Sequence, residues 1–271
     1  MSKFVIDASK PRIGLGIKEL FRYKDLFFIL AWRDLRVRYA QTFLGLIWAF
    51  IQPLATLLIF VVIFGRALNV DTGDIPYPVF ALAGMSGWTY FAFVLNQSGT
   101  SIIGAQEMVK KVYFPRLVIP LSKAVVGFVD FFITFIFLMC LMIYYQVSLT
   151  ANIFYFPLFF VLNVLAALAV GIWTSALTIR YRDFQHVIPF VVQIGLYATP
   201  IAYPSSLIPQ EYQTLYFLNP MAGVVEGYRF SLLGTDFMAE RSYISFALII
   251  ILFITGLFYF KRVERVMADL V

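Results

Sequence analysis

Six long apolar runs constrain the fold of this chain more than any other feature. They cover residues 43–65, 77–103, 119–145, 153–179, 186–204 and 242–260. The hydrocarbon core of a bilayer is roughly 30 Å thick, and a helix needs about 20 apolar residues to cross it. The sequence therefore predicts an all-α membrane protein with six transmembrane helices, organised as one domain over residues 1–271.

The composition agrees with a membrane protein. Hydrophobic residues make up 61% of the 271 residues and charged residues only 13%, whereas soluble domains contain roughly 45–50% apolar and about 25% charged residues. The net charge of +6 does not indicate nucleic-acid binding, because the placement of charges matters more than their sum in a membrane protein. The single cysteine, Cys140, and the single histidine, His186, offer neither a disulfide nor a His/Cys metal site.

The basic residues predict the orientation of the chain. If both termini are cytoplasmic, only Arg66, Arg229 and Arg241 of the 21 Lys and Arg residues lie outside, as the positive-inside rule requires. This orientation holds only if residues 207–233 do not cross the membrane. The Asn219-Pro220 pair divides that segment into two parts too short to span, so we expect a re-entrant pair of short helices.

An interface helix is predicted over residues 18–40, just before the first apolar run. One apolar stripe of this helix contains Phe21, Phe28, Trp32, Leu35 and Tyr39, and the opposite stripe contains Tyr23, Leu26, Leu30 and Val37. A helix with two apolar stripes fits between lipid and protein better than on lipid alone. Two interpretations of Arg33, Arg36 and Arg38 stay open: they anchor the helix to anionic headgroups of membrane lipids, or they receive a phosphate-bearing substrate headgroup.

The loop after the second apolar run mixes basic and apolar residues. In "QEMVKKVYFPRLVIPLSK" the candidates for contact with a partner are Met108, Val109, Lys110, Lys111, Val112, Tyr113, Phe114 and Arg116. Exposed apolar groups in a cytoplasmic loop indicate a docking surface, and we expect a short helix within residues 106–118. The alternative is a loop that lies on the membrane.

Polar side chains follow helical spacing within the first and fifth runs. The candidates for the wall of a channel are Gln52, Thr56, Phe60, Gln193, Tyr197 and Tyr203. Such stripes also form packing faces between membrane helices. Asp130 lies inside the third run, where a carboxylate is either functional or held in a structural pair.

Motifs for catalysis or nucleotide binding are absent from the sequence. The chain contains no GxxxxGK[ST] phosphate loop, no GxSxG nucleophile elbow and no HExxH zinc motif. These absences favour a transport subunit over an enzyme.

Several motifs in order resemble the transmembrane subunit of the ABC-2 type polysaccharide exporters, which serve O-antigen, capsule and teichoic-acid export. The motifs are "WRDLRVRYAQTFLGLIWAFIQPL", "MVKKVYFPRLVIP", "RYRDF", "LNPM" and "VEGYR", and the resemblance extends from about residue 20 to 262. It implies a homodimer in the bacterial inner membrane with a translocation channel at the dimer axis. It also implies two copies of a separate ABC ATPase subunit, which would bind ATP and Mg²⁺, so that this chain needs no cofactor of its own.

The same resemblance implies a role for each segment. The segment 106–118 would be the coupling helix against the ATPase, and residues 207–233 would be periplasmic gate helices. The substrate would be a glycan on undecaprenyl pyrophosphate, most simply O-antigen for lipopolysaccharide biosynthesis, with its diphosphate near Arg33, Arg36 or Arg38. Two competing hypotheses are a membrane-embedded transferase of lipid-linked sugars, which would need Asp130 or Asp71 and Asp74, and an ABC-2 permease for teichoic acid, capsule, lipid or a small molecule.

Overall fold

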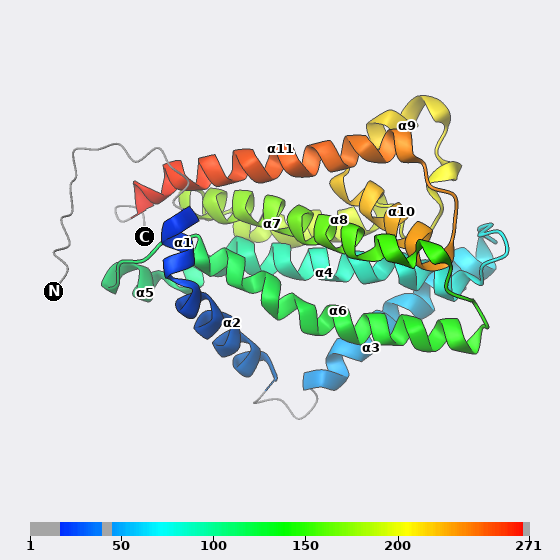
Figure 1. Cartoon of the computed structure of the whole chain (residues 1–271), viewed down its shortest axis with the longest axis horizontal. Coiled ribbons are helices and arrows are strands. Elements are labelled where there is room, and N and C mark those ends of the chain that lie inside the picture. Colours follow the sequence, from blue (N-terminus) through cyan, green and yellow to red (C-terminus); the bar gives the residue numbers. More distant parts are fainter. Residues whose placement is uncertain (1–16, 40–44, 268–271) are drawn as a thin grey trace.

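Helices form all the regular elements in the part of the chain that the computed structural model describes, residues 17–39 and 45–267 (Figure 1). The elements are α1 (Ile17–Arg22), α2 (Lys24–Tyr39), α3 (Gly45–Phe60), the π-helix η1 (Val61–Ala67), α4 (Tyr77–Gly104), α5 (Gln106–Lys111), α6 (Val118–Tyr144), η2 (Ala151–Tyr155), α7 (Phe156–Arg180), α8 (Phe184–Ala198), η3 (Ser205–Leu207), α9 (Gln210–Tyr216), α10 (Pro220–Leu233) and α11 (Ala239–Glu264). The prediction of an all-α protein is confirmed for these residues.

Within residues 17–39 and 45–267, five helical stretches are long and apolar enough to cross a membrane. They are Ile47–Ala67, Tyr77–Gly104, Val118–Tyr144, Ala151–Arg180 and Glu240–Glu264, and each corresponds to one predicted run. The start of the first predicted run, at residue 43, lies outside the described residues. The same holds for the predicted end of the interface helix at residue 40.

The fifth predicted span, residues 186–204, differs from the structure. Its helix, α8, has 15 residues and ends at Ala198, which gives about 22 Å of helix, less than the roughly 30 Å of a bilayer core. Pro200 explains this end, because the residue before a proline is driven out of the helical region. Thr199 is indeed extended, with φ −100° and ψ 146°, and residues 199–204 continue as turns.

The central helix of the bundle is α4. It packs against α6 on one side and α7 on another, and α11 covers α7 (Figure 1). Small residues allow this close packing, as is usual between membrane helices. A Cβ on Gly87 would lie 2.9 Å from the ring of Tyr228 on α10, so only glycine lets α10 approach α4 at this point.

The predicted segment between the fifth and sixth runs contains two short helices, α9 and α10, which meet at Asn219. The Asn219 side chain caps α10 by accepting a hydrogen bond of 3.0 Å from the backbone N–H of Met221, and Pro220 occupies the first turn. Nearly all of α10 is buried within the protein. Two short helices at this position agree with the prediction.

A buried ion pair holds α10 in the bundle. Arg229 lies 3.3 Å from Glu226, donates to the backbone oxygens of Ile201 at 2.7 Å and Phe80 at 3.4 Å, and stacks 3.6 Å from the Phe80 ring. We expected Arg229 to be an external loop charge, and the structure corrects this: the side chain is enclosed because α10 packs inside the bundle.

The interface helix is two helices, α1 and α2, with a turn at Tyr23. Leu30 and Ala31 of α2 are buried, and Leu30 joins an apolar cluster at the end of the bundle that also contains α5. Phe28 and Trp32, from the other predicted stripe, are largely exposed. The stripe that contains Leu30 thus contacts the bundle at this residue, while Phe28 and Trp32 of the other stripe do not. Val37 belongs to the same stripe as Leu30 but is exposed.

Candidate functional site

A polar cavity of about 350 Å³ lies among α3, α4, α6 and α8. Its hydrogen-bonding side chains are Arg38, Gln52, Thr56, Thr89, Asn96, Gln97, Asp130, Thr134 and Gln193, and Trp88 and Phe93 contribute aromatic surface. Polar groups at membrane depth are costly unless they pair or face water. The amide and hydroxyl groups of four helices therefore share one polar space inside the bundle.

Three of the six predicted channel residues line this cavity: Gln52, Thr56 and Gln193. The other three do not. Phe60 is buried in the core, because it packs against Phe64 and Tyr197.

Tyr197 is largely exposed and packs against the Phe60 ring, and the hydroxyl of Tyr203 donates to the backbone oxygen of Tyr197 at 2.9 Å. Asn96 and Gln97 of α4 were missed by the spacing argument. The polar "NQSGTS" stretch inside an otherwise apolar run is the signal that could have found them.

Asp130 joins the interface helix to the bundle. Its Oδ2 accepts from the Arg38 guanidinium at 2.5 Å and its Oδ1 accepts from the Tyr39 hydroxyl at 2.7 Å. Arg38 also lies 4.2 Å from the centroid of the Phe93 ring, a favourable cation–π distance. Burial, strengthened by the hydrogen bond to the Asp130 carboxylate, raises the pKa of Tyr39, so the phenol remains a proton donor. Of the two sequence interpretations, the paired role describes Asp130.

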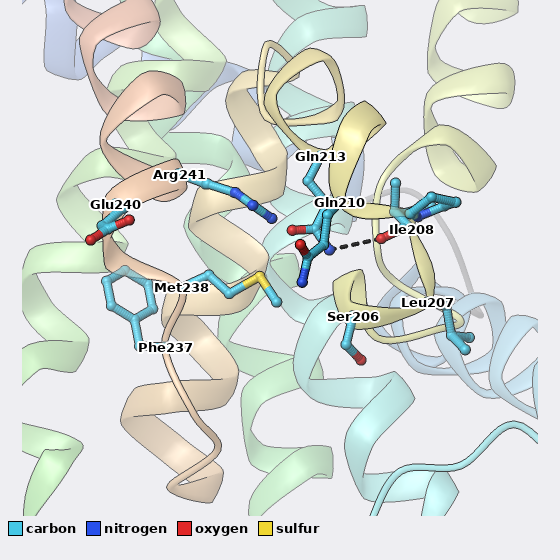
Figure 2. A pocket seen from close by; sticks show the side chains of 10 residues that line it. Ser206, Leu207, Ile208, Gln210, Gln213, Phe237, Met238, Glu240 and Arg241 are labelled. Atoms are coloured by element: carbon cyan, nitrogen blue, oxygen red, sulfur yellow. Dashed lines mark hydrogen bonds between the residues drawn. The ribbon is translucent and has the colours of Figure 1, made fainter.

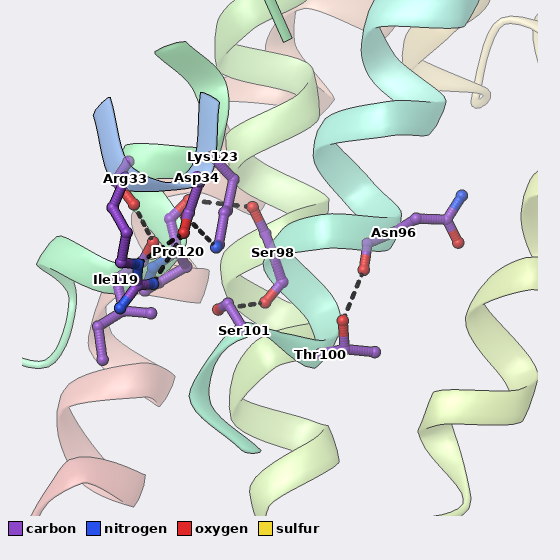
Figure 3. A network of polar contacts seen from close by, with 10 residues as sticks. Arg33, Asp34, Asn96, Ser98, Thr100, Ser101, Ile119, Pro120 and Lys123 are labelled. Carbon is purple, nitrogen blue, oxygen red and sulfur yellow. Dashed lines mark hydrogen bonds and ion pairs between the residues drawn. The ribbon is translucent and has the colours of Figure 1, made fainter. Parts of the chain in front are cut away.

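The three predicted phosphate-binding arginines do not form one cluster. Arg33 donates to Asp34 at 2.8 Å, and Figure 3 shows Lys123 on the other side of the same carboxylate. Arg38 points inward to Asp130. Arg36 is exposed and makes no ion pair with any residue in 17–39 or 45–267.

A second, smaller polar pocket leads toward the cavity. It has about 230 Å³ and is lined partly by Asp34, Arg38, Gln97 and Lys123. Arg38 and Gln97 belong to both spaces. Polar groups therefore continue from the side of α2 into the cavity inside the bundle.

The predicted coupling helix, residues 106–118, is helical only over α5, which ends at Lys111. Val112 is extended, and the residue before Pro115 is disfavoured in a helix, so the helix does not continue. Among the predicted contact residues, Lys110, Lys111, Val112 and Tyr113 are exposed, and the exposed fraction of Tyr113 reaches 79%. Met108 and Arg116 are half-buried.

Val109 and Phe114 correct the prediction of exposed apolar side chains. Both are buried, with only 3% of Phe114 exposed, because they belong to the apolar cluster formed with Phe260 and Val263 at the end of α11. They support the loop from inside and present no surface to a partner.

Glu264 fixes this loop and was missed by the sequence argument. Its Oε1 accepts from the backbone N–H of Arg116 at 2.8 Å, and the Arg116 guanidinium donates to the Glu264 backbone oxygen at 3.0 Å. Lys261 pairs with the same carboxylate at 2.8 Å. The last turn of α11 thus holds the segment that follows α5.

Two of the three acids named for a transferase, Asp130 and Asp71, are engaged in structural contacts, and Asp74 is exposed on the turn beside Asp71. Asp130 is paired with Arg38, and the Asp71 carboxylate accepts from the backbone N–H of Gly73 at 2.9 Å in a tight turn. Within residues 17–39 and 45–267 there is no group of three His, Cys, Asp or Glu residues that could hold a metal ion.

Comparison with known proteins gives consistent matches. The family described as ABC-2 type transporter matches residues 25–233. An O-antigen export system permease protein, RfbA, of Klebsiella pneumoniae is 28% identical over 247 residues, which are 91% of this chain and 95% of that protein. The RfbA protein of Myxococcus xanthus is 27% identical over 215 residues, 79% of this chain and 82% of the relative.

A third relative comes from another export system. The polysialic acid transport protein KpsM of Escherichia coli is 26% identical over 202 residues, 72% of this chain and 76% of its own. The matched family region runs from α2 to the end of α10 and so includes the polar cavity and the Arg38–Asp130 pair. With five helices able to cross a membrane, the chain is a multi-pass protein of the inner membrane, and it belongs to the ABC-2 type transporter family.

Proposed function

We propose that this chain is the permease subunit of an ATP-driven exporter that moves a lipid-linked polysaccharide across the inner membrane. The observation that carries the proposal is the polar cavity among α3, α4, α6 and α8, found in a chain of a transporter family. Amide and hydroxyl groups exchange hydrogen bonds with sugar hydroxyls, and the aromatic faces of Trp88 and Phe93 suit the apolar face of a sugar ring. The relatives named as O-antigen export permeases favour O-antigen as the substrate class.

The size of the cavity supports a homodimer. A space of about 350 Å³ holds a few sugar units at most and not a hydrated polymer. The spanning window of α3 is only 17% buried, compared with 78% for α4, so α3 has a large surface available for a second copy. We therefore place the translocation channel between two chains, with Gln52, Thr56 and Gln193 on its wall.

The topology of the proposal has six crossings. It needs α8, extended by residues 199–204, to serve as the sixth crossing beside the five long helices. Both termini are then cytoplasmic, and α9 and α10 form a gate at the periplasmic side. The charge distribution along the sequence supports this orientation.

Energy comes from a separate ATPase in this proposal, because the sequence contains no phosphate loop. The exposed residues Lys110, Lys111, Val112 and Tyr113 form the surface we assign to its contact. Glu264 and the buried Phe114 keep this surface in place, so that movement of the ATPase reaches α11 directly.

Arg36 is the arginine we propose for the diphosphate of an undecaprenyl-linked glycan. It is exposed and unpaired within the described residues, whereas Arg33 and Arg38 are already neutralised by carboxylates. Arg36→Glu is expected to reduce substrate-stimulated ATP hydrolysis more than protein abundance. A loss of abundance alone would support the anchoring interpretation instead.

Complementation tests the function as a whole. In cells that make an O-antigen but lack their own permease, the chain and its ATPase together are expected to restore the glycan on the cell surface. Without the chain, the lipid-linked glycan should accumulate inside. Surface glycan that appears with the chain but with no ATPase in the cell would refute the proposal.

A further inference from the structure

A further pocket, which we call the outer pocket, lies between the 205–213 connection and the start of α11 (Figure 2). It measures about 660 Å³, within the roughly 300–1,000 Å³ typical of small-molecule sites. It is separate from the polar cavity, with which it shares no lining residue. In the orientation proposed above it opens on the periplasmic side.

Gln213 brings an unsatisfied acceptor to this pocket. Its side chain is only 4% exposed, and its Nε2 donates to the backbone oxygen of Ile208 at 2.7 Å. Its Oε1 is buried and accepts no hydrogen bond from the described residues. An acceptor left unpaired in the interior is unfavourable, so the Gln213 amide is a polar group at this pocket whose hydrogen-bonding capacity the described residues do not use fully.

Arg241 brings unused donors to the same pocket. It is half-buried, and no hydrogen bond or ion pair joins it to another described residue. Its neighbour Glu240 forms no ion pair with it among the described residues. Figure 2 shows the Arg241 side chain extending toward the amides of Gln210 and Gln213.

The combination of groups identifies the class of ligand. The pocket offers a guanidinium, two amides, the Ser206 hydroxyl and the Glu240 carboxylate, together with the apolar surface of Phe237. Donors and acceptors in similar number suit a polyhydroxylated molecule, because a carboxylate would repel a simple anion and a lipid chain would leave these polar groups unpaired. An aromatic ring provides the contact that the C–H face of a sugar requires.

We propose that the outer pocket is a carbohydrate-binding subsite that holds sugar units of the glycan as it leaves the protein. The inference rests on the proposed function for its substrate and its orientation. Contacts at this point, beyond the polar cavity, oppose backward sliding of the polymer between cycles of ATP hydrolysis.

Cysteine labelling tests the subsite in the complete exporter in cells. Cys140 is the only cysteine of the chain, so Cys140→Ser provides a background without thiols. Ser206→Cys then places one thiol at the pocket, and Asp74→Cys places one on an exposed turn outside it. The probe is a membrane-impermeant maleimide, added to cells that synthesise the glycan and to cells in which its synthesis is blocked.

Glycan in transit is expected to slow labelling of Ser206→Cys several-fold and to leave labelling of Asp74→Cys unchanged. Adding Arg241→Gln should weaken occupancy about tenfold, the effect of losing one charge-assisted hydrogen bond, and so remove most of the protection. Arg66→Gln, another arginine in the same predicted external set, is the matched control and should preserve it.

Three results would overturn the inference. Equal labelling of Ser206→Cys in both kinds of cell, while surface glycan still depends on the chain, refutes the subsite and leaves the proposed function intact. Protection that survives Arg241→Gln indicates steric shielding without binding. Absence of labelling at both positions shows that the pocket does not face outward, and loss of chain-dependent surface glycan altogether refutes the proposed function itself.

Discussion

Removing either partner of the Arg38–Asp130 pair should destabilise the protein by unequal amounts. The pair links α2 to α6 at 2.5 Å, with 34% of the arginine side chain exposed and 12% of the aspartate. Arg38→Met keeps the apolar stem of the side chain and removes its charge, which leaves the Asp130 carboxylate with Tyr39 as its remaining partner. Asp130→Asn leaves a guanidinium that still reaches water and the Phe93 ring.

The magnitudes follow from this asymmetry. Breaking a fully buried ion pair costs about 3–5 kcal/mol, and the exposure of Arg38 reduces that to about 2 kcal/mol through screening by water. Loss of the cation–π contact with Phe93 adds about 0.5–1 kcal/mol. We expect Arg38→Met to lower the free energy of unfolding by about 3 kcal/mol and Asp130→Asn by about 1 kcal/mol, with a coupling energy of about 1–2 kcal/mol in the double variant.

Denaturant titration of the purified protein in mixed micelles, followed by tryptophan fluorescence, measures these differences. The matched control is the Glu107–Lys111 pair, whose two side chains are each 73% exposed, so that Glu107→Gln should change the stability by less than about 0.5 kcal/mol. Equal effects of Arg38→Met and Asp130→Asn, or additivity of the two, would refute the argument that this pair is a partly buried link.

Three further predictions concern packing and the loop after α5. Gly227→Ala should lower the free energy of unfolding by about 1–3 kcal/mol, because its Cβ would lie 2.1 Å from the Phe159 ring on α7. Gly104→Ala, whose Cβ would have no atom within 4 Å, should not lower it. An equal decrease in the free energy of unfolding for both variants would contradict this prediction. Phe114→Ala should lower the free energy of unfolding by about 3–5 kcal/mol. Tyr113→Asp should leave the free energy of unfolding nearly unchanged and reduce the amount of ATPase that co-purifies with the chain. Normal co-purification would show that Tyr113 is not part of the contact. Glu264→Gln should lower the free energy of unfolding by about 1–2 kcal/mol and lower the amount of glycan exported per ATP hydrolysed. An unchanged ratio of export to hydrolysis would show that the contact with α11 does not transmit movement.

The elements that follow from local composition could be predicted from the sequence. Bilayer thickness sets the length of apolar runs, and the five long helices match their runs within a few residues. The early end of α8 also has a local cause in Pro200, although the apolar run continues past it. Gln52 and Gln193 were found because helical spacing put polar side chains on one face of each run.

The contacts that position these elements could not be predicted in the same way. Arg38 meets Asp130 across 92 positions, and Arg116 meets Glu264 across 148. The periodicity of a sequence does not predict contacts between residues so far apart in the chain, since each pairing depends on how whole helices pack. The same holds for Phe114: the sequence predicted an exposed side chain in this loop, but the end of α11 covers it.

The buried Arg229 on α10 has a consequence for biogenesis. A charge buried away from water is costly unless it is paired and hydrogen-bonded, and besides Glu226 on its own helix Arg229 finds its oxygen partners on Phe80 and Ile201, both synthesised earlier. Residues 220–233 can therefore take their native place only after α4 and the turns that follow α8 are in position. Synthesis from the N-terminus supplies these partners first, so the order of elements along the chain matches the order in which the bundle can accept them.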